Sequence, residues 1–283
     1  MRIKRVKMKN QEVKDLITST FNDVAKKYDN NKQFVISAKK MLDIIKKTGK
    51  STNENLNILD LSAGTGNITI ELSKQYPNAK IYAVDISQEM LNVAKEKTLK
   101  EGISNIQYTL QDVENLEFGN MKFDIITCGY GLFFYPNMDD VLKDICNRLT
   151  DDGMFVFSTF TKAAFQPYGK IFLDLLSSDY GIKPPITIEE KLLETKEEIE
   201  QFLHQESNIN YEINDIEIRY PMDIKQWWEL LNTTGYQGLL TKLENNYEEF
   251  ETKYLLLLEN MSEERTIDFN ADSFISVVSK IRK

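Results

Sequence analysis

The fold of this chain is decided by the stretch Asp60-Leu61-Ser62-Ala63-Gly64-Thr65-Gly66. An apolar run, Asn57-Ile58-Leu59, precedes the stretch, and an amphipathic run, Ile68-Thr69-Ile70-Glu71-Leu72, follows it. This order predicts a strand, a tight glycine turn and a helix. Gly64 and Gly66 allow a sharp turn and let a ligand approach the backbone closely. The free N–H groups at the start of the helix face the same point, so the stretch predicts a cofactor-binding loop.

Two kinds of cofactor loop begin in this way. A dinucleotide-binding loop has the pattern G-x-G-x-x-G/A, in which the third small residue lets the helix and the strand pack closely. Thr69, which is neither Gly nor Ala, occupies that third position here. An acid four residues before the first Gly, as Asp60 is here, is also not part of the dinucleotide fingerprint. The sequence therefore disfavours a NAD-dependent dehydrogenase.

Three later segments predict further strands of the same sheet. Lys80–Asp85 is apolar and ends in an acid, which can accept hydrogen bonds from both ribose hydroxyls of an adenosine. Ile86 follows and can cover one face of the adenine, and Ser87 is expected to cap the next helix. Ile106–Asp112 alternates as a strand and ends in Gln-Asp, whereas Phe123–Tyr130 has the composition of a buried strand.

In this order and spacing, the four segments resemble the class I S-adenosylmethionine (SAM) dependent methyltransferases, in the small-molecule branch that contains the ubiquinone and menaquinone methyltransferases. The resemblance is strongest over residues 35–160. It implies an α/β fold: a Rossmann-like, seven-stranded, mostly parallel sheet with an antiparallel last strand, helices on both faces and a helical lid. It implies SAM as cofactor and S-adenosylhomocysteine (SAH) as product. The implied cofactor-binding residues are Tyr28, Asp60, Ser62, Ala63, Gly64, Gly66, Asp85, Ile86, Met90, Gln111, Asp112, Val113 and Cys128.

The resemblance also implies roles for single residues. Asp60 would help to hold the ammonium of SAM, and Asp112 would accept a hydrogen bond from the adenine amino group. The end of Phe123–Tyr130 would line the space near the reactive methyl group. Ser62 replaces a glycine that many family members have, and we expect its φ to be negative because an L-residue avoids positive φ.

The rest of the chain is expected to add a lid to the core. Phe21–Asp29 resembles the N-terminal element that folds over cofactor and substrate in the quinone-type enzymes, which makes Tyr28 a candidate contact. Asn210–Tyr220 alternates as one strand, and Ser273–Ile281 predicts the last strand. The expected parts are a lid element (1–34), the SAM-binding core (35–160), a lid insertion after strand 5 (161–195), a core helix with strand 6 (196–222), a helical lid insertion (223–264) and the last core strand (265–283).

Candidate catalytic residues are Tyr28, Tyr130 and His204. His204 is the only histidine, but it falls near the end of a predicted helix, where the helix dipole favours it without any catalytic task. A tyrosine needs a strongly lowered pKa to act as a base at neutral pH. The aromatic residues of the lid segments predict a hydrophobic or aromatic acceptor; the candidate substrate-pocket residues are Phe21, Tyr130, Phe133, Phe134, Phe165, Trp227 and Trp228.

The composition of the chain limits the classes of binding partner and the cellular location that we expect. The chain has 283 residues, of which 41% are hydrophobic, and a net charge of −9. The acidic balance disfavours nucleic acid as a substrate, and we interpret the basic residues Arg2, Lys4, Arg5, Lys7 and Lys9 as a solvated arm. Two cysteines without a disulfide pattern and the lack of a long apolar run predict a cytoplasmic protein without a membrane span. The sequence shows no cluster of acids and histidine that would predict a metal site.

The leading hypothesis is thus a SAM-dependent methyltransferase acting on a small, fairly apolar molecule. Two alternatives remain open: a peptide or protein methyltransferase, which an open acidic groove would favour, and a SAM-binding sensor without catalysis, which a lid with no room for an acceptor would favour. The sequence does not identify the acceptor, the methylated atom or the oligomeric state, for which monomer and homodimer both remain open.

Overall fold

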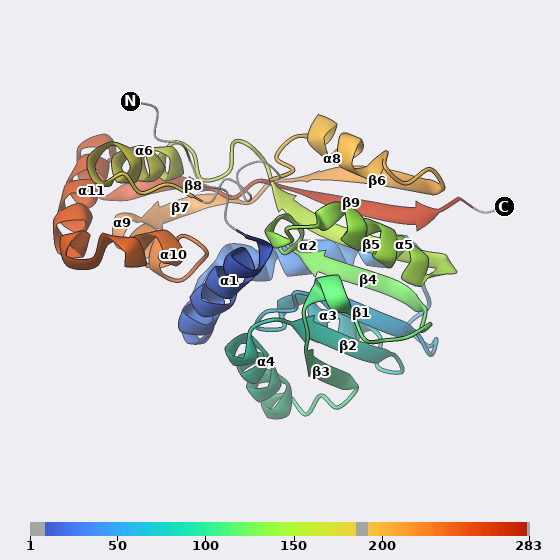
Figure 1. Ribbon diagram of the computed structural model, residues 1–283. Helices are drawn as coiled ribbons and strands as arrows, with labels where there is room; N and C mark the ends of the chain where they lie inside the picture. Colours follow the sequence, from blue (N-terminus) through green and yellow to red (C-terminus); the bar gives the residue numbers. More distant parts are fainter. Residues whose placement is uncertain (1–8, 185–191, 282–283) are drawn as a thin grey trace.

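The protein is built on one mixed sheet that carries most of the core (Figure 1). The computed structural model describes residues 9–184 and 192–281; the basic residues Arg2, Lys4, Arg5 and Lys7 lie outside this part. The sheet has seven strands in the order β3-β2-β1-β4-β5-β9-β6, and β9 runs antiparallel to both of its neighbours. The predicted fold class is therefore confirmed. The strands are β1 (Asn57–Leu61), β2 (Lys80–Asp85), β3 (Ile106–Leu110), β4 (Phe123–Gly129), β5 (Leu149–Phe160), β6 (Ile209–Ile216) and β9 (Ser273–Lys280).

Helices cover both faces of this sheet. Successive residues of each strand point to opposite faces, and the residues on both faces are apolar. Leu59 and Ile126 face α5 (Met138–Arg148) and α8 (Lys196–Leu203), whereas Ile58 and Ile125 face α2 (Lys32–Lys47) and α3 (Asn67–Gln75). Among the described residues, no helix is long and apolar enough to cross a membrane. The α- and 3-10 helices (η) around the core are α1 (Asn10–Val24), η1 (Ala25–Asn30), α2 (Lys32–Lys47), α3 (Asn67–Gln75), α4 (Gln88–Lys100), η2 (Val113–Asn115), η3 (Leu132–Phe134), α5 (Met138–Arg148) and α8 (Lys196–Leu203).

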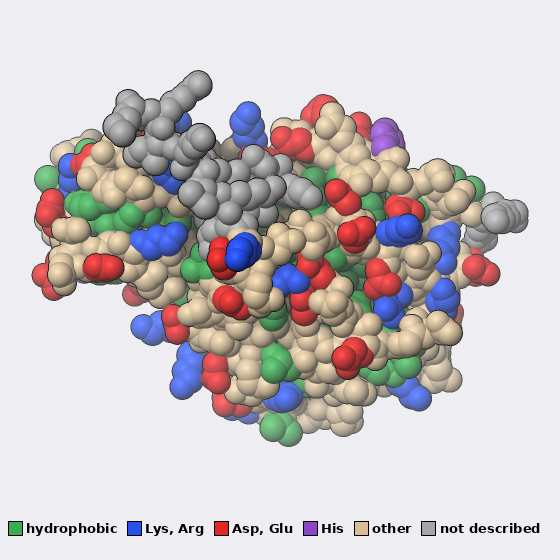
Figure 2. All heavy atoms as spheres, viewed as in Figure 1, with side chains coloured by type: hydrophobic (Ala, Val, Ile, Leu, Met, Phe, Trp, Pro, Cys, Tyr) green, Lys and Arg blue, Asp and Glu red, His purple; other side chains and the backbone are tan. Residues whose placement is uncertain are grey.

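A second body of structure projects from one end of the sheet (Figure 1). Its elements pack around a hydrophobic cluster of their own, in which Trp227 and Phe250 are fully buried. This insertion contains α6 (Tyr168–Tyr180), β7 (Arg219–Asp223), α9 (Ile224–Asn232), α10 (Gln237–Leu240), η4 (Thr241–Asn246), α11 (Tyr247–Met261) and β8 (Thr266–Asn270). On its outer surface, as over the sheet, acidic and basic side chains are interspersed (Figure 2).

One predicted strand is wrong in a way that explains the insertion. The alternating run Asn210–Tyr220 is not one strand but two, β6 in the main sheet and β7 in a separate two-stranded sheet with β8. The break falls where β9 begins, because the pairing of β6 with β9 ends at Ile216 and Ser273. Asp272 then accepts hydrogen bonds from the Ile218 backbone and the Arg219 guanidinium, which turns the chain out of the sheet.

Helix α1 connects the two bodies, since it packs between α4 of the core and α10 of the insertion (Figure 1). At the second contact, Gly238 of α10 lies directly against Thr20 of α1, and a Cβ built on Gly238 would be 2.7 Å from Thr20 Oγ1. A larger residue at position 238 would therefore force Thr20 or one of the two helices to shift.

We predict that Gly238→Ala and Thr20→Ala are energetically coupled. The added methyl group in Gly238→Ala collides with the Thr20 hydroxyl, and removal of that hydroxyl in the double variant relieves the collision. Urea denaturation of the four proteins of the cycle should give a coupling free energy of roughly 1 kcal/mol or more in favour of the double variant. The helix-propensity gain of alanine is common to both backgrounds and cancels. Simple additivity would contradict this packing.

Candidate functional site

The loop after β1 lines a cleft at the carboxyl edge of the parallel strands, where open α/β sheets bind their ligands. Asp85, at the end of β2, fixes this loop: its carboxylate accepts hydrogen bonds from the Gly64 and Ser87 backbone N–H groups, both at 2.8 Å. Ser87 in turn caps α4 through a bond from the Met90 N–H to its hydroxyl. Burial raises the pKa of Asp85 to about 6, against the hydrogen bonds that lower it.

Ser62 adopts a left-handed conformation with a φ of 49°, so the expectation of a negative φ is wrong. Its hydroxyl lies 2.7 Å from the Tyr135 hydroxyl, in the segment after β4. The two segments approach so closely that a Cβ on Gly131 would lie 2.6 Å from Ser62 Cβ. The hydrogen bond to Tyr135 and this packing hold Ser62 in a backbone conformation that glycine adopts without strain.

Two small cavities border the loop. The first, of about 80 Å³, contacts Asp85, Ile86 and Asp112, and the second, of about 60 Å³, contacts Ala63 and Thr65; both reach Ser62, Gly64, Tyr28 and Tyr130. We call them together the cofactor cleft. It brings together, from the sequence-predicted cofactor residues, Tyr28, Ser62, Ala63, Gly64, Asp85, Ile86, Met90, Asp112 and Val113. Asp60, Gly66, Gln111 and Cys128 do not line these cavities.

Asp60 is fully buried below the loop and is held by two threonine hydroxyls. Thr69 donates to one carboxylate oxygen and Thr127 to the other, the latter at 2.8 Å. Burial raises the pKa of Asp60 to about 7, and these two hydrogen bonds oppose the rise. Thr69, whose size argues against a dinucleotide loop, thus has a structural partner in the acid that precedes the glycines.

A third cavity, of about 310 Å³, adjoins the cleft on the side of the insertion. It is lined mainly by apolar side chains, and it shares Phe21, Tyr28, Tyr130 and Phe134 with the cleft. Tyr130 stacks on Phe160 with the ring centroids 4.2 Å apart. Aromatic rings therefore form the junction between the two spaces. We call this space the acceptor cavity.

The structure separates the other candidates into two groups. Phe133 and Phe165 also line the acceptor cavity, but Trp227 and Trp228 do not. Both tryptophans are buried in the core of the insertion, where the Trp227 indole N–H donates to the Tyr254 hydroxyl at 2.7 Å. Their local pattern is that of a buried helix face, which does not distinguish a core from a cavity wall.

None of the three catalytic candidates has the environment of a base at this site. His204 is exposed, hydrogen-bonds to the Tyr211 hydroxyl at 2.9 Å and lines none of the three cavities. Burial raises the pKa of both Tyr28 and Tyr130 above the ordinary value for tyrosine. These phenols stay protonated at neutral pH, so they are hydrogen-bond donors rather than general bases.

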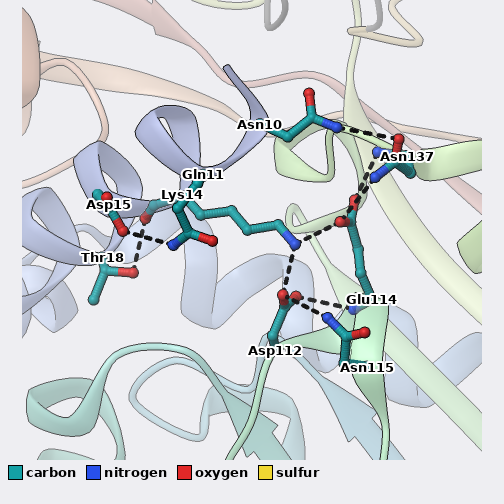
Figure 3. Close-up of polar contacts among 9 residues, drawn as sticks. All are labelled: Asn10, Gln11, Lys14, Asp15, Thr18, Asp112, Glu114, Asn115 and Asn137. Carbon is teal, nitrogen blue, oxygen red and sulfur yellow. Dashed lines mark hydrogen bonds and ion pairs between the residues drawn. The ribbon is translucent and has the colours of Figure 1, made fainter. Parts of the chain in front are cut away.

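Sequence reasoning missed Lys14, which connects α1 to the cleft (Figure 3). Its ammonium lies 2.6 Å from Asp112 Oδ2 and 2.5 Å from Glu114 Oε2, and the three side chains are 13%, 26% and 8% exposed. Burial lowers the pKa of Lys14, but the bonds and charges of the two acids outweigh it and leave the pKa raised. The signal was the spacing of Lys14, Ile17 and Phe21, which places all three on one face of α1.

A second ion pair holds η1 over the loop. Asp29 Oδ2 lies 2.7 Å from the ammonium of Lys97 on α4, and Asp29 Oδ1 accepts hydrogen bonds from Thr65 and Asn67. Lys97 also donates to the Thr65 carbonyl at 2.9 Å. Tyr28 is the neighbour of Asp29, so this network fixes the position of Tyr28 at the meeting point of all three cavities.

The residues present suit a SAM molecule. Gly64 and Gly129 line the cleft, and a Cβ on either would have no heavy atom nearer than 4.0 Å, so the backbone borders open space. The Asp85 carboxylate accepts backbone N–H groups at both oxygens, and a carboxylate has further acceptor positions that suit a hydroxyl group. Among the residues that the structure describes, no group of three or more potential metal ligands occurs.

This combination of sheet, glycine loop and buried acid defines a nucleotide-cofactor α/β protein of the methyltransferase type. The sequence model of the ubiE/COQ5 methyltransferase family matches residues 5–178. The chain therefore belongs to the ubiE/COQ5 methyltransferase family. Membership confirms the predicted resemblance to this family, whose cofactor is SAM.

Individual relatives match over about half of this chain. The malonyl-[acyl-carrier protein] O-methyltransferase of Bacillus anthracis is 31% identical over 156 residues, 54% of this chain and 55% of the relative. A ubiquinone/menaquinone biosynthesis C-methyltransferase of Rickettsia bellii is 30% identical over 161 residues, 55% of this chain and 65% of the relative. The chain thus spans between about half and two thirds of the length of these relatives.

Solved structures share the fold at lower identity. The YcgJ protein of Bacillus subtilis has a TM-score of 0.57 and 19% identity, over 86% of this chain and 99% of that one. The plantazolicin methyltransferase BpumL, solved in complex with SAH, has a TM-score of 0.54 and 16% identity, over 95% of this chain and 96% of that one.

The buried state of Asp60 predicts a specific pH dependence of stability. Its folded pKa of about 7 lies above the ordinary 3.8, so the native state holds a proton that the unfolded chain releases. The contribution of Asp60 to stability is thus complete below about pH 4 and is lost as the pH rises to about 7. In Asp60→Asn this decline should be absent. The unfolding free energy of the variant should therefore fall less steeply with pH than that of the wild type, and the two slopes should differ by at most about 1.4 kcal/mol per pH unit.

The measurement is urea denaturation of the ligand-free wild type and Asp60→Asn at several pH values between 4 and 7. Asp85 titrates in the same sense in both proteins, so the difference between them reports the titration of Asp60 together with its charge interaction with Asp85. An asparagine amide can accept from one threonine hydroxyl and donate to the other, which keeps the local packing. Parallel curves for the two proteins would contradict a protonated Asp60.

Proposed function

We propose that this chain transfers a methyl group from SAM to a small, largely apolar or aromatic acceptor and releases SAH. The observation that carries the proposal is the junction of the cofactor cleft with the apolar acceptor cavity, at Phe21, Tyr28, Tyr130 and Phe134. Such a junction lets a cofactor and an acceptor meet end to end, as a direct displacement requires. The size of the acceptor cavity, about 310 Å³, is that of a small-molecule site.

Within the cleft, Asp85 is the proposed partner of the ribose hydroxyls and Ile86 covers the adenine. Asp112 is the proposed acceptor for the adenine amino group. Two of its contacts are the ammonium of Lys14 and the Glu114 N–H, the latter at 3.0 Å. The loop from Ser62 to Gly64 borders the amino-acid end of the ligand.

SAM, when bound, supplies a methyl group on a positively charged sulfur, and this group is reactive without a metal or a redox step. The contribution of the chain is alignment and exclusion of water. The aromatic junction surrounds the space through which the methyl group passes, and α1 with the insertion covers it. Because Tyr28 and Tyr130 remain protonated, the proposed reaction suits an acceptor atom that is already nucleophilic.

The two other hypotheses fit the geometry less well. An open acidic groove would favour a peptide or protein methyltransferase, but the space that adjoins the cleft is a largely apolar cavity lined by α1 and the insertion. A lid with no room for an acceptor would favour a sensor without catalysis, whereas the acceptor cavity leaves such room. Both observations favour a small-molecule enzyme.

The test is calorimetric titration with SAM and SAH, with NADH as the control. We expect both sulfur ligands to bind and NADH not to bind. Asp85→Asn should weaken SAH binding about tenfold or more, because it removes the charge that receives the ribose hydroxyls. Asp151→Asn is the matched control, since Asp151 is exposed at the opposite end of its strand. Failure of SAM and SAH to bind a protein verified to be ligand-free would refute the proposal.

A further inference from the structure

Among the described residues, one charged side chain lines the acceptor cavity. Of the described residues that line it, all are apolar or uncharged except Glu194, which lies just before α8. The lining therefore offers an acceptor apolar contact over most of its surface and a negative charge at one place. This distribution is informative because a carboxylate in an apolar cavity favours cationic or hydrogen-bond-donating ligands and repels anions.

The backbone of Glu194 is held firmly. Its carbonyl accepts a hydrogen bond from the Lys162 N–H at 3.0 Å, and its N–H donates to Glu198 Oε2 at 2.7 Å. Its own carboxylate makes no hydrogen bond or ion pair with another residue in the described ranges 9–184 and 192–281. Burial and the charge of Glu198 raise the pKa of Glu194, and the charge of the exposed Lys162 opposes this rise. The carboxylate is thus positioned by its backbone but remains available to a ligand.

A second polar group lies beside Glu194. Thr161 directly precedes Lys162, whose backbone pairs with Glu194, and Thr161 also lines the acceptor cavity. The Thr161 hydroxyl oxygen is buried and has no hydrogen-bond partner within the described part of the chain. A buried hydroxyl without a partner is unfavourable, so a ligand that engages it after a rotation of the Thr161 side chain gains binding free energy. We call Thr161 and Glu194 the polar corner.

The polar corner is separate from the place where the methyl group would arrive. The junction with the cofactor cleft is formed by Phe21, Tyr28, Tyr130 and Phe134, whereas neither Thr161 nor Glu194 lines the cleft. Tyr236, another lining residue, has a pKa raised to about 12 by burial and by the charge of Glu194. Glu194 therefore acts electrostatically on the wall that the insertion contributes.

We infer that Glu194 is a specificity-determining residue, which binds an ammonium or another hydrogen-bond-donating group of an elongated apolar acceptor, with Thr161 as second partner. This group is the end of the acceptor remote from the atom that receives the methyl group. Acceptors that carry a carboxylate or a phosphate at that end bind more weakly because of the same charge. The inference rests on the proposed function, which it deepens by naming the acceptor class.

Three probes with one aromatic skeleton test the inference: 2-naphthylmethylamine, 2-naphthalenemethanol and 2-naphthoate. Each is titrated calorimetrically into the wild-type protein saturated with SAH. We expect the amine to bind about tenfold or more tightly than the carboxylate, with the alcohol between them. Glu194→Gln should remove most of this preference, and Glu194→Lys should reverse it. Thr161→Val should weaken the amine and the alcohol by severalfold.

Glu197→Gln is the matched control, because Glu197 is an exposed acid three residues away that does not line the cavity. It should keep the wild-type order. A wild-type complex that binds the carboxylate as tightly as the amine, or that binds none of the probes, would overturn the inference without any variant. An unchanged preference in a folded Glu194→Gln would do the same. The SAH titration that precedes each experiment tests the proposed function separately.

Discussion

The geometry of the cofactor cleft depends on the buried carboxylate of Asp85. It links two segments of the chain, the glycine loop at Gly64 and the start of α4 at Ser87, by accepting one backbone N–H from each. Ser87 also fixes the position of α1, because its hydroxyl donates a hydrogen bond to the Asn22 side chain of that helix at 2.7 Å. A single desolvated acid at the end of β2 thus orders the loop, a helix start and the helix that covers the cleft. Without it, the buried Ser87 N–H and the partly buried Gly64 N–H would have no partner.

Helix α1 is the element that both halves of the site share. One of its faces closes the cofactor cleft through Lys14 and Ile17, and the same helix contributes Leu16 and Thr20 to the acceptor cavity. Its ion pairs to Asp112 and Glu114 are largely shielded from solvent, so salt screens them less than exposed pairs. A change in the position of α1 therefore alters the cofactor cleft and the acceptor cavity together, which couples the binding of the two ligands by geometry.

The parts of the fold that sequence could predict are those set by local patterns. The β1 loop, the acid of β2 and the cap of α4 follow from neighbouring residues, and the structure shows all of them. The missed features depend on partners far along the chain. Ser62 tolerates its left-handed backbone because of Tyr135, and Lys14 finds an acid 98 positions away. The alternation of Asn210–Tyr220 gave no sign that its second part pairs with β8 rather than β9.

The central sheet and the insertion contribute to different parts of the site because each is packed around its own core. The cleft is built from groups anchored in the central sheet, so its donors and acceptors are fixed by the same hydrogen bonds that hold the fold. The insertion has a hydrophobic core of its own around Trp227, and its inner wall, with Leu230, Tyr236 and Leu239, faces the acceptor cavity. A substitution on that wall disturbs neither Asp85 nor the glycine loop. The lining of the acceptor cavity can therefore differ between proteins that share the same cofactor cleft. For this reason the family match identifies the cofactor, whereas the acceptor has to be inferred from the residues that line the acceptor cavity.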